Sequence, residues 1–326
     1  MRKALILLWS LLIFQVKQGK AELTVAKLFS SGMVLQEAPA TATIFGSYTE
    51  APVTVTLAFE GQQPISLDAN LDEENLRWDV VLPQVSSRSS CNISISSGKE
   101  EILLEEILFG DVWFCAGQSN MGWTLGGTEN HTEELEMAKA YNNIRMYRID
   151  DQPNSQPQYD IQKVRNGWLS WNSPSSEWPE GTEWEGGHWP RPLGDFSGIC
   201  FLFARELSDH LGNKPLGLIT GSYAGTRIEA WSPPETLSAC GIEDYVDEKH
   251  PWHSNSYLYN GMVAPMHGVT IKGAIWYQVI RQNVFSHHQY ISYIHGHSRV
   301  WRLIQQPPQS TGISLRARTH RVKIVK

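Results

Sequence analysis

The feature that most constrains this chain is an apolar segment that stops abruptly before a serine. Residues 112–116 read Val-Trp-Phe-Cys-Ala, and Gly-Gln-Ser-Asn-Met follows at 117–121. A short run rich in strand-forming residues predicts a buried β-strand. Open α/β folds place their chemistry where such strands end. The segment therefore predicts an α/β fold with Ser119 at the carboxyl edge of its sheet.

Ser119 is the candidate nucleophile. Gly117 permits a sharp turn, which would expose the Ser119 hydroxyl beside the backbone N–H of the same residue. A serine that performs acyl transfer needs this pairing of an exposed hydroxyl with a donor for the developing oxyanion. A serine after a strand also commonly caps a helix, so spacing alone leaves both interpretations open.

The composition bounds the classes of function. The chain has 326 residues, of which 41% are apolar and 19% are charged, and this length allows two domains. The formal net charge of −7 argues against general binding to nucleic acid or to an anionic membrane. The sequence carries no dinucleotide fingerprint, phosphate loop or zinc-type cysteine spacing.

Residues 1–21 predict a signal peptide. Arg2 and Lys3 precede an apolar run at residues 4–14, and the small residues Gly19 and Ala21 follow. The run is too short to span a membrane, and we place cleavage near Ala21. We therefore expect a protein of the secretory pathway, either lysosomal or extracellular.

Two sequons and four cysteines fit a secretory route. Asn92 and Asn130 stand in Asn-x-Ser/Thr sequons, so both are expected glycosylation sites. The cysteines lie far apart, and no disulfide framework is evident among their three pairings. Cys115 and Cys200 lie in apolar runs, where we expect buried thiols.

Residues 22–108 predict a small all-β domain. Short apolar or alternating runs are separated by glycine and proline, and they fall at residues 25–29, 41–45, 53–59, 78–82, 91–95 and 102–107. Many short strands at close spacing are typical of an antiparallel β-sandwich. No catalytic constellation is visible in this part, so we expect a structural domain that buttresses its neighbour.

Residues 109–278 predict an α/β domain. After the strand at 112–116, the pattern indicates a strand at 144–149, a helix at 196–211, and strands at 216–220 and 271–278. Alternation of strand, helix and strand is typical of a doubly wound parallel sheet.

Three segments carry a resemblance to a known family. Residues 117–121 resemble the first sequence block of the SGNH hydrolases, in the variant of the sialate O-acetylesterases and related carbohydrate acetylesterases. Residues 221–231, Gly-Ser-Tyr-Ala-Gly-Thr-Arg-Ile-Glu-Ala-Trp, resemble the second block, although Ala224 replaces the first of two usual glycines. Residues 276–278, Trp-Tyr-Gln, resemble the start of the third.

The resemblance implies an SGNH-like domain that hydrolyses O-acetyl esters of sialic acids, releasing sialate and acetate. Ser119 would be the nucleophile, the N–H groups of Ser119 and Gly225 would bind the oxyanion, and Gln278 would belong to the same oxyanion hole. Such acyl transfer needs no metal or organic cofactor. An esterase for other acetylated carbohydrates is the alternative.

A tryptophan-rich loop at residues 151–192 has two interpretations. Its indoles could stack on the sugar of an acetylated substrate, or they could pack the loop onto its own domain, as long ordered loops require. The five residues are Trp168, Trp171, Trp178, Trp184 and Trp189.

The resemblance stops after Gln278, where Val-Ile-Arg-Gln-Asn stands in place of the family's Gly-Glu. Residues 279–326 contain eight lysines and arginines and no acidic residue. We expect an unrelated, disordered basic tail that follows an incomplete hydrolase domain, and we attribute it to an alternative exon or reading frame. The family's Asp-x-x-His block would lie beyond this chain, so a catalytically inactive, truncated variant is the second interpretation.

Overall fold

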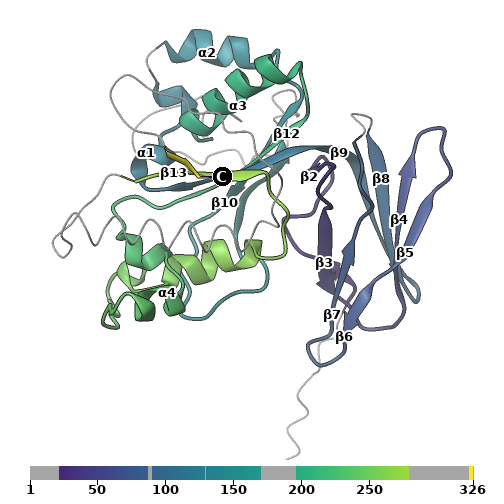
Figure 1. Cartoon of the computed structure of the whole chain (residues 1–326), viewed down its shortest axis with the longest axis horizontal. Helices are drawn as coiled ribbons and strands as arrows, with labels where there is room; N and C mark the ends of the chain where they lie inside the picture. Colours follow the sequence, from purple (N-terminus) through teal and green to yellow (C-terminus); the bar gives the residue numbers. More distant parts are fainter. Residues whose placement is uncertain (1–21, 87–89, 129, 170–195, 279–322, 326) are drawn as a thin grey trace, which may run out of the picture.

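The computed structural model describes residues 22–86, 90–128, 130–169, 196–278 and 323–325 (Figure 1). It has the mixed α/β composition that the sequence predicts, with a central sheet covered by helices and further strands at one end. Residues 1–21 and most of the tail lie outside the described residues, so the structure does not test the signal peptide or the disorder of residues 279–322.

Parallel strands form the centre of the sheet. Their spatial order is β10 (Ile144–Ile149), β12 (Leu216–Ser222), β9 (Glu100–Gly117) and β13 (Gly273–Tyr277). Antiparallel strands flank them, with β11 (Val164–Leu169) beside β10 and β14 (Lys323–Val325) beside β13. The apolar run at 112–116 lies in β9 between two neighbours, which explains why it reads as nearly continuous apolar sequence.

Helices cover both faces of this sheet (Figure 1). On one face lie α1 (Ser119–Gly122), α2 (His131–Ala138) and α3 (Gly198–Leu211). On the other lie α4 (Pro234–Ala239) and the turns η4 (Ile228–Trp231), η5 (Pro251–His253), η6 (Tyr259–Val263) and η7 (Ala264–Met266). The turn η1 (Leu125–Gly127) follows α1.

Helix α3 shows how local sequence sets its bounds. The Ser197 hydroxyl accepts a hydrogen bond from the Cys200 N–H at 3.3 Å, which caps the amino end. Gly212 ends the helix in the left-handed conformation, with φ of 62°. The predicted helix at 196–211 is therefore confirmed within two residues.

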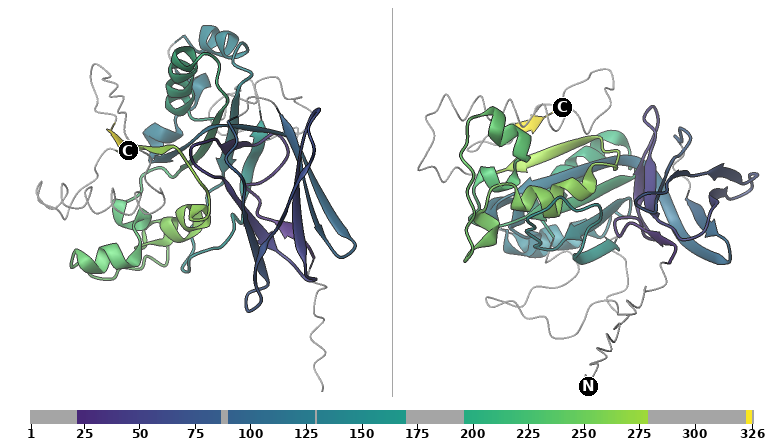
Figure 2. Two further views of the ribbon diagram at one scale, coloured as in Figure 1. Left: turned by 45° about the vertical axis from the view of Figure 1, so that its right-hand side comes forward. Right: turned by 90° about the horizontal axis from the view of Figure 1, so that it is seen from below.

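The first strands form two sheets at one end of the molecule (Figure 2). One has the order β1 (Thr24–Val25), β3 (Thr43–Ser47), β7 (Arg77–Val81) and β6 (Asn70–Asp72). The other joins β5 (Ile65–Asp68), β4 (Val53–Phe59) and β8 (Cys91–Ser97) to the first half of β9. In β4, Val53, Val55 and Leu57 are fully buried and alternate with partly exposed threonines, as a half-buried strand requires.

Strand β9 links the second of these sheets to the central one. Its first half pairs with β8, its middle pairs with β2 (Val34–Gln36), and its last residues pair with β12 and β13. The domain boundary expected between residues 108 and 109 therefore falls inside one continuous strand. A single buried apolar cluster also runs from the first strands to one face of the central sheet.

Candidate active site

Three strands end together at the edge that we call the carboxyl edge of the central sheet. Gly117 of β9 is in register with Ser222 of β12 and with Tyr277 of β13. The Gln118 N–H donates to the Tyr277 carbonyl at 3.0 Å. The three segments that resemble family blocks thus lie side by side, although more than 150 residues separate the first from the last.

Gly117 cannot be replaced at this junction without rearrangement. Its φ of 148° lies outside the range that L side chains usually adopt. A Cβ atom on Gly117 would lie 2.1 Å from the Tyr277 carbonyl oxygen. The glycine therefore provides both the turn that the sequence predicts and the close approach of β13.

Ser119 begins α1 directly after the strand. Its side chain is exposed, whereas Met121 of the same turn is fully buried and anchors α1 against α3 and the sheet. Among the residues that the structure describes, none forms a hydrogen bond with the Ser119 hydroxyl. The arrangement presents the hydroxyl to solvent at the first residue of a helical turn, where backbone N–H groups lack partners within the helix.

Thr226 joins the three segments. Its carbonyl oxygen accepts hydrogen bonds from the side-chain amides of Gln118 and, at 3.0 Å, Gln278. Its hydroxyl donates to the Tyr223 carbonyl and accepts from the Trp231 indole, both at 2.9 Å. Because Thr226 is fully buried, these bonds fix the turn after β12 relative to the strand that carries Ser119.

Gly225 lies at the tip of that turn, one residue before Thr226. It is exposed, has φ of 72°, and has open space where a Cβ atom would be. The structure thus places Gly225 on a turn held against Gln118. Gln278 positions the same turn through its amide, a role that the sequence did not suggest.

A disulfide lies beneath the carboxyl edge and corrects the expectation of two buried thiols. Cys115 of β9 and Cys200 of α3 are both fully buried, as predicted, but they are bonded to each other, with a Cα–Cα separation of 6.0 Å. Packing of α3 directly on β9 brings the two β-carbons within bonding range. Since 85 residues separate the cysteines, the sequence gives no sign of the pairing.

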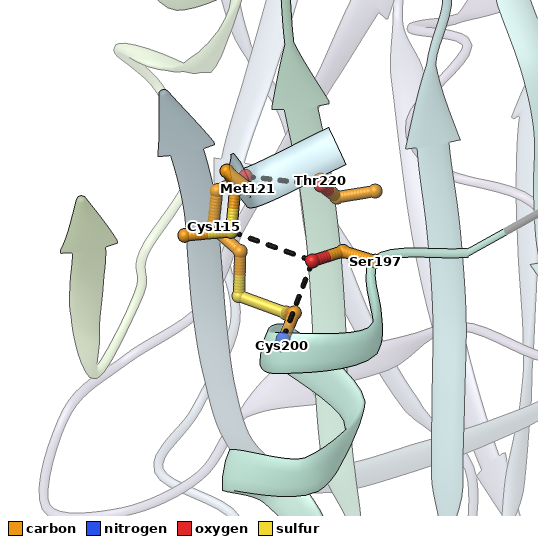
Figure 3. Close-up of a disulfide and its surroundings, with 5 residues drawn as sticks. All are labelled: Cys115, Met121, Ser197, Cys200 and Thr220. Atoms are coloured by element: carbon orange, nitrogen blue, oxygen red, sulfur yellow. Dashed lines mark hydrogen bonds between the residues drawn. A yellow bond between two sulfur atoms is a disulfide. The ribbon is translucent and has the colours of Figure 1, made fainter. Parts of the chain in front are cut away.

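Buried polar groups surround this disulfide (Figure 3). The Ser197 hydroxyl lies 3.4 Å from the Met121 sulfur, and the Thr220 hydroxyl donates to the Cys115 carbonyl at 3.1 Å. The residue two positions after Ser119 is therefore linked to the start of α3, which is itself bonded covalently to β9. The candidate nucleophile rests on a rigid support.

An acid–histidine pair lies on the loop between α4 and η5. His250 Nδ1 is 3.6 Å from Asp247 Oδ2, and the two residues have Asp-x-x-His spacing within the chain itself. The His250 and Lys249 N–H groups donate to Asp247 and hold the pKa of its carboxyl below the usual value. The sequence prediction looked for an acid–histidine pair only in residues 279–326 and therefore did not include this one.

Aromatic rings connect this pair to the strand end, without a hydrogen bond to Ser119. The His250 ring contacts Trp252 at 5.3 Å, and Trp252 stacks on Tyr223 at 5.5 Å. Tyr223 in turn donates its N–H to the Gly117 carbonyl at 3.0 Å. His250 thus lies two aromatic rings away from the strand end, and no described residue forms a hydrogen bond with the Ser119 hydroxyl.

Most of the tryptophan-rich loop lies outside the described residues, including Trp171, Trp178, Trp184 and Trp189. Trp168 belongs to β11, is 7% exposed, and donates its indole N–H to the Leu28 carbonyl at 2.6 Å. For this residue, packing is the observed role.

The described residues contain neither a metal-binding cluster nor a helix that could span a membrane. In that part of the chain, no group of three or more His, Cys, Asp or Glu residues could hold a metal ion. The helices described there are all too short or too polar to cross a membrane.

Comparison with known proteins gives the following relations. The family model for carbohydrate esterase, sialic acid-specific acetylesterase, matches residues 109–295, more than half of the chain and past Gln278. The sialate O-acetylesterase of Homo sapiens is 36% identical over 270 residues, and that of Mus musculus is 31% identical over 292 residues. Each alignment covers 78% of this chain but 48% and 51% of the relative, respectively. The chain therefore spans about half the length of the curated relatives it matches.

The fold is also similar to that of a solved structure. A carbohydrate acetylesterase from Xanthomonas citri superposes with a TM-score of 0.68 over 86% of this chain and 57% of that chain. The sequence identity is 23%, so this likeness establishes a shared fold and leaves substrate to other arguments.

Proposed function

Because the chain belongs to the carbohydrate esterase family of sialic acid-specific acetylesterases, we propose that its carboxyl edge is the site at which O-acetyl esters of sialic acids are hydrolysed. The observation that carries this proposal is the meeting of three motif segments around Thr226. They leave a single exposed serine at the end of a buried strand, which is where open α/β sheets bind their ligands.

The chemistry proceeds through an acetyl-serine. The Ser119 oxygen attacks the acetyl carbonyl carbon, and the carbonyl oxygen becomes an oxyanion that the N–H groups of Ser119 and Gly225 stabilise. Each such donor is worth about 3 kcal/mol in comparable sites. Collapse of the intermediate expels the sugar oxygen, which takes up the proton lost by Ser119. Water then attacks the acetyl-serine, releases acetate and restores the hydroxyl.

This cycle needs a base for the Ser119 proton, oriented by an acid. By family resemblance, a later Asp-x-x-His block supplies both in the longer relatives. The free Ser119 hydroxyl among the described residues supports the second candidate, in which this chain has the esterase site but lacks its base and is inactive. A third candidate is hydrolysis of acetyl esters on other carbohydrates, which the Xanthomonas likeness supports only at the level of fold.

The deciding experiment measures acetate release from 9-O-acetylated sialic acid by the purified chain and by Ser119→Ala. The proposal expects turnover that falls by roughly 10³-fold or more in the variant. Turnover that survives in Ser119→Ala overturns the role of Ser119. A folded chain without turnover supports the inactive form, and an acetylated xylan or glucose ester turned over faster than the sialate supports the third candidate.

We also propose that the first strands form a β-sandwich that supports the central sheet. The alternating burial of β4 and the single apolar cluster shared with the central sheet support this arrangement. The continuous β9 would transmit the support directly to Gly117. Residues 22–108 would then have no chemistry of their own.

We propose that the protein enters the secretory pathway, and that it resides in lysosomes or outside the cell. The N-terminal apolar run supports a signal peptide, and the disulfide Cys115–Cys200 fits an oxidising compartment. Asn92 and Asn130 are both exposed, as glycosylation requires. Treatment of the secreted chain with a glycosidase tests this, since an unchanged mass would argue against both glycosylation sites.

A further inference from the structure

Trp123 is the most exposed large apolar side chain among the described residues, with 61% of its surface accessible. Its ring is nevertheless held in place. The indole N–H donates to the Gly127 carbonyl at 2.8 Å, and a Cβ atom at Gly127 would lie 2.8 Å from the indole nitrogen. One edge of the ring thus rests against a glycine, and its orientation is set by a hydrogen bond within the loop.

Trp123 is also adjacent to the candidate nucleophile. Helix α1 starts at Ser119, and Trp123 caps its carboxyl end, where the backbone leaves the helix with φ of −61° and ψ of 122°. Residues four apart on a helical turn have Cβ atoms roughly 5–6 Å apart. Ser119 and Trp123 therefore stand at the two ends of this single turn, and their side chains start close together.

The loop that carries Trp123 is anchored on both sides. The Trp123 carbonyl accepts a hydrogen bond from the Gly198 N–H at 2.8 Å, at the start of α3. Leu125, two residues on, is fully buried. The Trp123 ring is therefore held in one orientation while most of its surface faces water. A ligand could bind this face without first having to order the ring.

A second aromatic group borders the strand end at the turn after β12. Tyr223 follows β12, is bonded to Gly117 through its N–H, and stacks on Trp252 with an angle of 19° between the rings. Aromatic side chains thus stand beside Ser119 on α1 and beside Gly117 on β12. Binding sites for small molecules are typically lined by such rings together with a few polar groups.

We propose that Trp123 is a sugar-binding residue, whose indole face covers the apolar C–H face of the pyranose ring while Ser119 reacts with the ester that the sugar carries. The contact would remove apolar surface from water on both partners and orient the acetyl group. This inference rests on the proposed function, because it assigns the sugar of that substrate to a particular side chain.

The test measures binding, so its result does not depend on whether this chain hydrolyses the ester. The Ser119→Ala form is titrated with 9-O-acetylated N-acetylneuraminic acid, and the dissociation constant is followed by ligand-observed NMR. Adding Trp123→Leu, which keeps an apolar side chain but removes the ring, should weaken binding roughly tenfold. Trp123→Phe keeps a ring and should recover most of the affinity.

Leu103→Ala is the matched control, because Leu103 is an exposed apolar residue of β9 in the strands far from the carboxyl edge. It should leave the dissociation constant unchanged. Equal affinity of the Trp123→Leu and unaltered proteins overturns the proposal, as does failure of the folded chain to bind the sugar at all. Thermal melts of each variant confirm that the fold is kept.

A kinetic comparison separates this inference from the proposed function. If the chain is catalytically active, kcat/KM for the acetylated sialate can be divided by kcat/KM for p-nitrophenyl acetate. This ratio should fall roughly tenfold in Trp123→Leu, because only the sialate has a pyranose ring. An unchanged ratio overturns the role of Trp123 and leaves Ser119 chemistry intact. Turnover that persists in Ser119→Ala overturns the proposed function instead.

Discussion

The two edges of the central sheet are built from the same strands and are held in opposite ways. At the amino edge, where the parallel strands begin, charged side chains form a cluster. Lys214 Nζ lies 2.6 Å from Glu37 Oε1 and 3.0 Å from Asp111 Oδ2, and Lys272 Nζ lies 3.5 Å from the other Asp111 oxygen. The Gln36 side chain donates to Asp111 and accepts from the Val112 N–H, so each charge there has partners.

At the carboxyl edge, neutral groups join the strand ends, and a nearby ion pair, Arg227 with Glu229 at 3.1 Å, lies in the turn that follows. Two glutamine amides donate to the Thr226 carbonyl, the Thr226 hydroxyl makes two more hydrogen bonds, and the disulfide ties β9 to α3. This frame satisfies its own polar groups and leaves the Ser119 hydroxyl free. The comparison teaches that ion pairs close one edge, whereas hydrogen bonds between neutral groups join the strand ends of the other and leave one polar group facing a ligand.

The largest effect should follow from removal of the disulfide, which supports only the carboxyl edge. Cys115→Ala with Cys200→Ala should lower the free energy of unfolding by about 4 kcal/mol, because the bond closes a long loop of 85 residues. Urea unfolding at neutral pH measures this loss.

Reduction provides the control for that variant. Dithiothreitol should destabilise the unaltered protein and leave the double variant unaffected, and Cys240→Ser should match the unaltered protein because Cys240 is a free, exposed thiol. Equal sensitivity of both proteins to the reductant would show that the disulfide does not carry the rigidity of this edge.

The next effect concerns the amino edge. Asp111→Ala should lower the free energy of unfolding by about 3 kcal/mol, because it leaves Lys214 with Glu37 alone and removes the nearer acceptor of the Gln36 amide. Asp111 is only 3% exposed. Guanidinium unfolding of the variant measures the loss.

Glu136→Ala is the matched control, since Glu136 pairs with Lys139 on the exposed side of α2. Surface pairs contribute at most about 1 kcal/mol. If Asp111→Ala were no more damaging than Glu136→Ala, the ion pairs would not be what closes the amino edge.

The elements that local pattern encodes could be predicted well. The alternation at residues 53–59 matches β4, and the predicted strand at 216–220 lies within β12 (Leu216–Ser222). Periodicity works here because burial repeats along the element itself. The sequence also placed Ser119 at a strand end, because glycine and serine after an apolar run mark such an edge.

The features that the sequence did not predict depend on contacts between distant segments. Strand β9 was expected as two strands, since Gly110 and Asp111 interrupt its apolar pattern, yet it is continuous. Gly110 serves close packing, because a Cβ atom there would lie 1.9 Å from the Pro215 carbonyl oxygen. The Thr226 carbonyl is a backbone atom that any residue carries, so no pattern of side chains could reveal it.

A smaller effect should separate hydrogen bonding from packing at the carboxyl edge. Thr226→Val keeps the shape of the side chain but leaves the fully buried Trp231 indole N–H without its acceptor. The free energy of unfolding should fall by about 2 kcal/mol. Thr220→Val provides a comparison, because its hydroxyl makes a single bond, to Cys115, and should cost about 1 kcal/mol. Equal losses in the two variants would remove Thr226 from its place as the organising residue.

The smallest effect is a pH dependence that only the amino edge should show. Burial alone would lower the pKa of Lys214, but hydrogen bonds to Glu37 and Asp111 raise it above the ordinary value. A raised folded-state pKa means that the ion pairs stabilise the protein fully below the unfolded-state pKa, about 10.4, and that this stability is lost as the pH rises through the folded-state value. The difference in free energy of unfolding between the unaltered protein and Lys214→Met should therefore be constant from about pH 7 to 9 and shrink above about 10.4.

Urea unfolding at a series of alkaline pH values gives this difference directly, because titrations common to both proteins cancel. Lys139→Met removes an exposed lysine of α2 and should stay close to the unaltered protein at every pH. Thr226→Val should likewise differ from the unaltered protein by the same amount across the series, since no charged group contributes to its hydrogen bonds. A loss that grew with pH in Thr226→Val, or a Lys214→Met difference that stayed constant to high pH, would mean that the two edges are not held by different kinds of interaction.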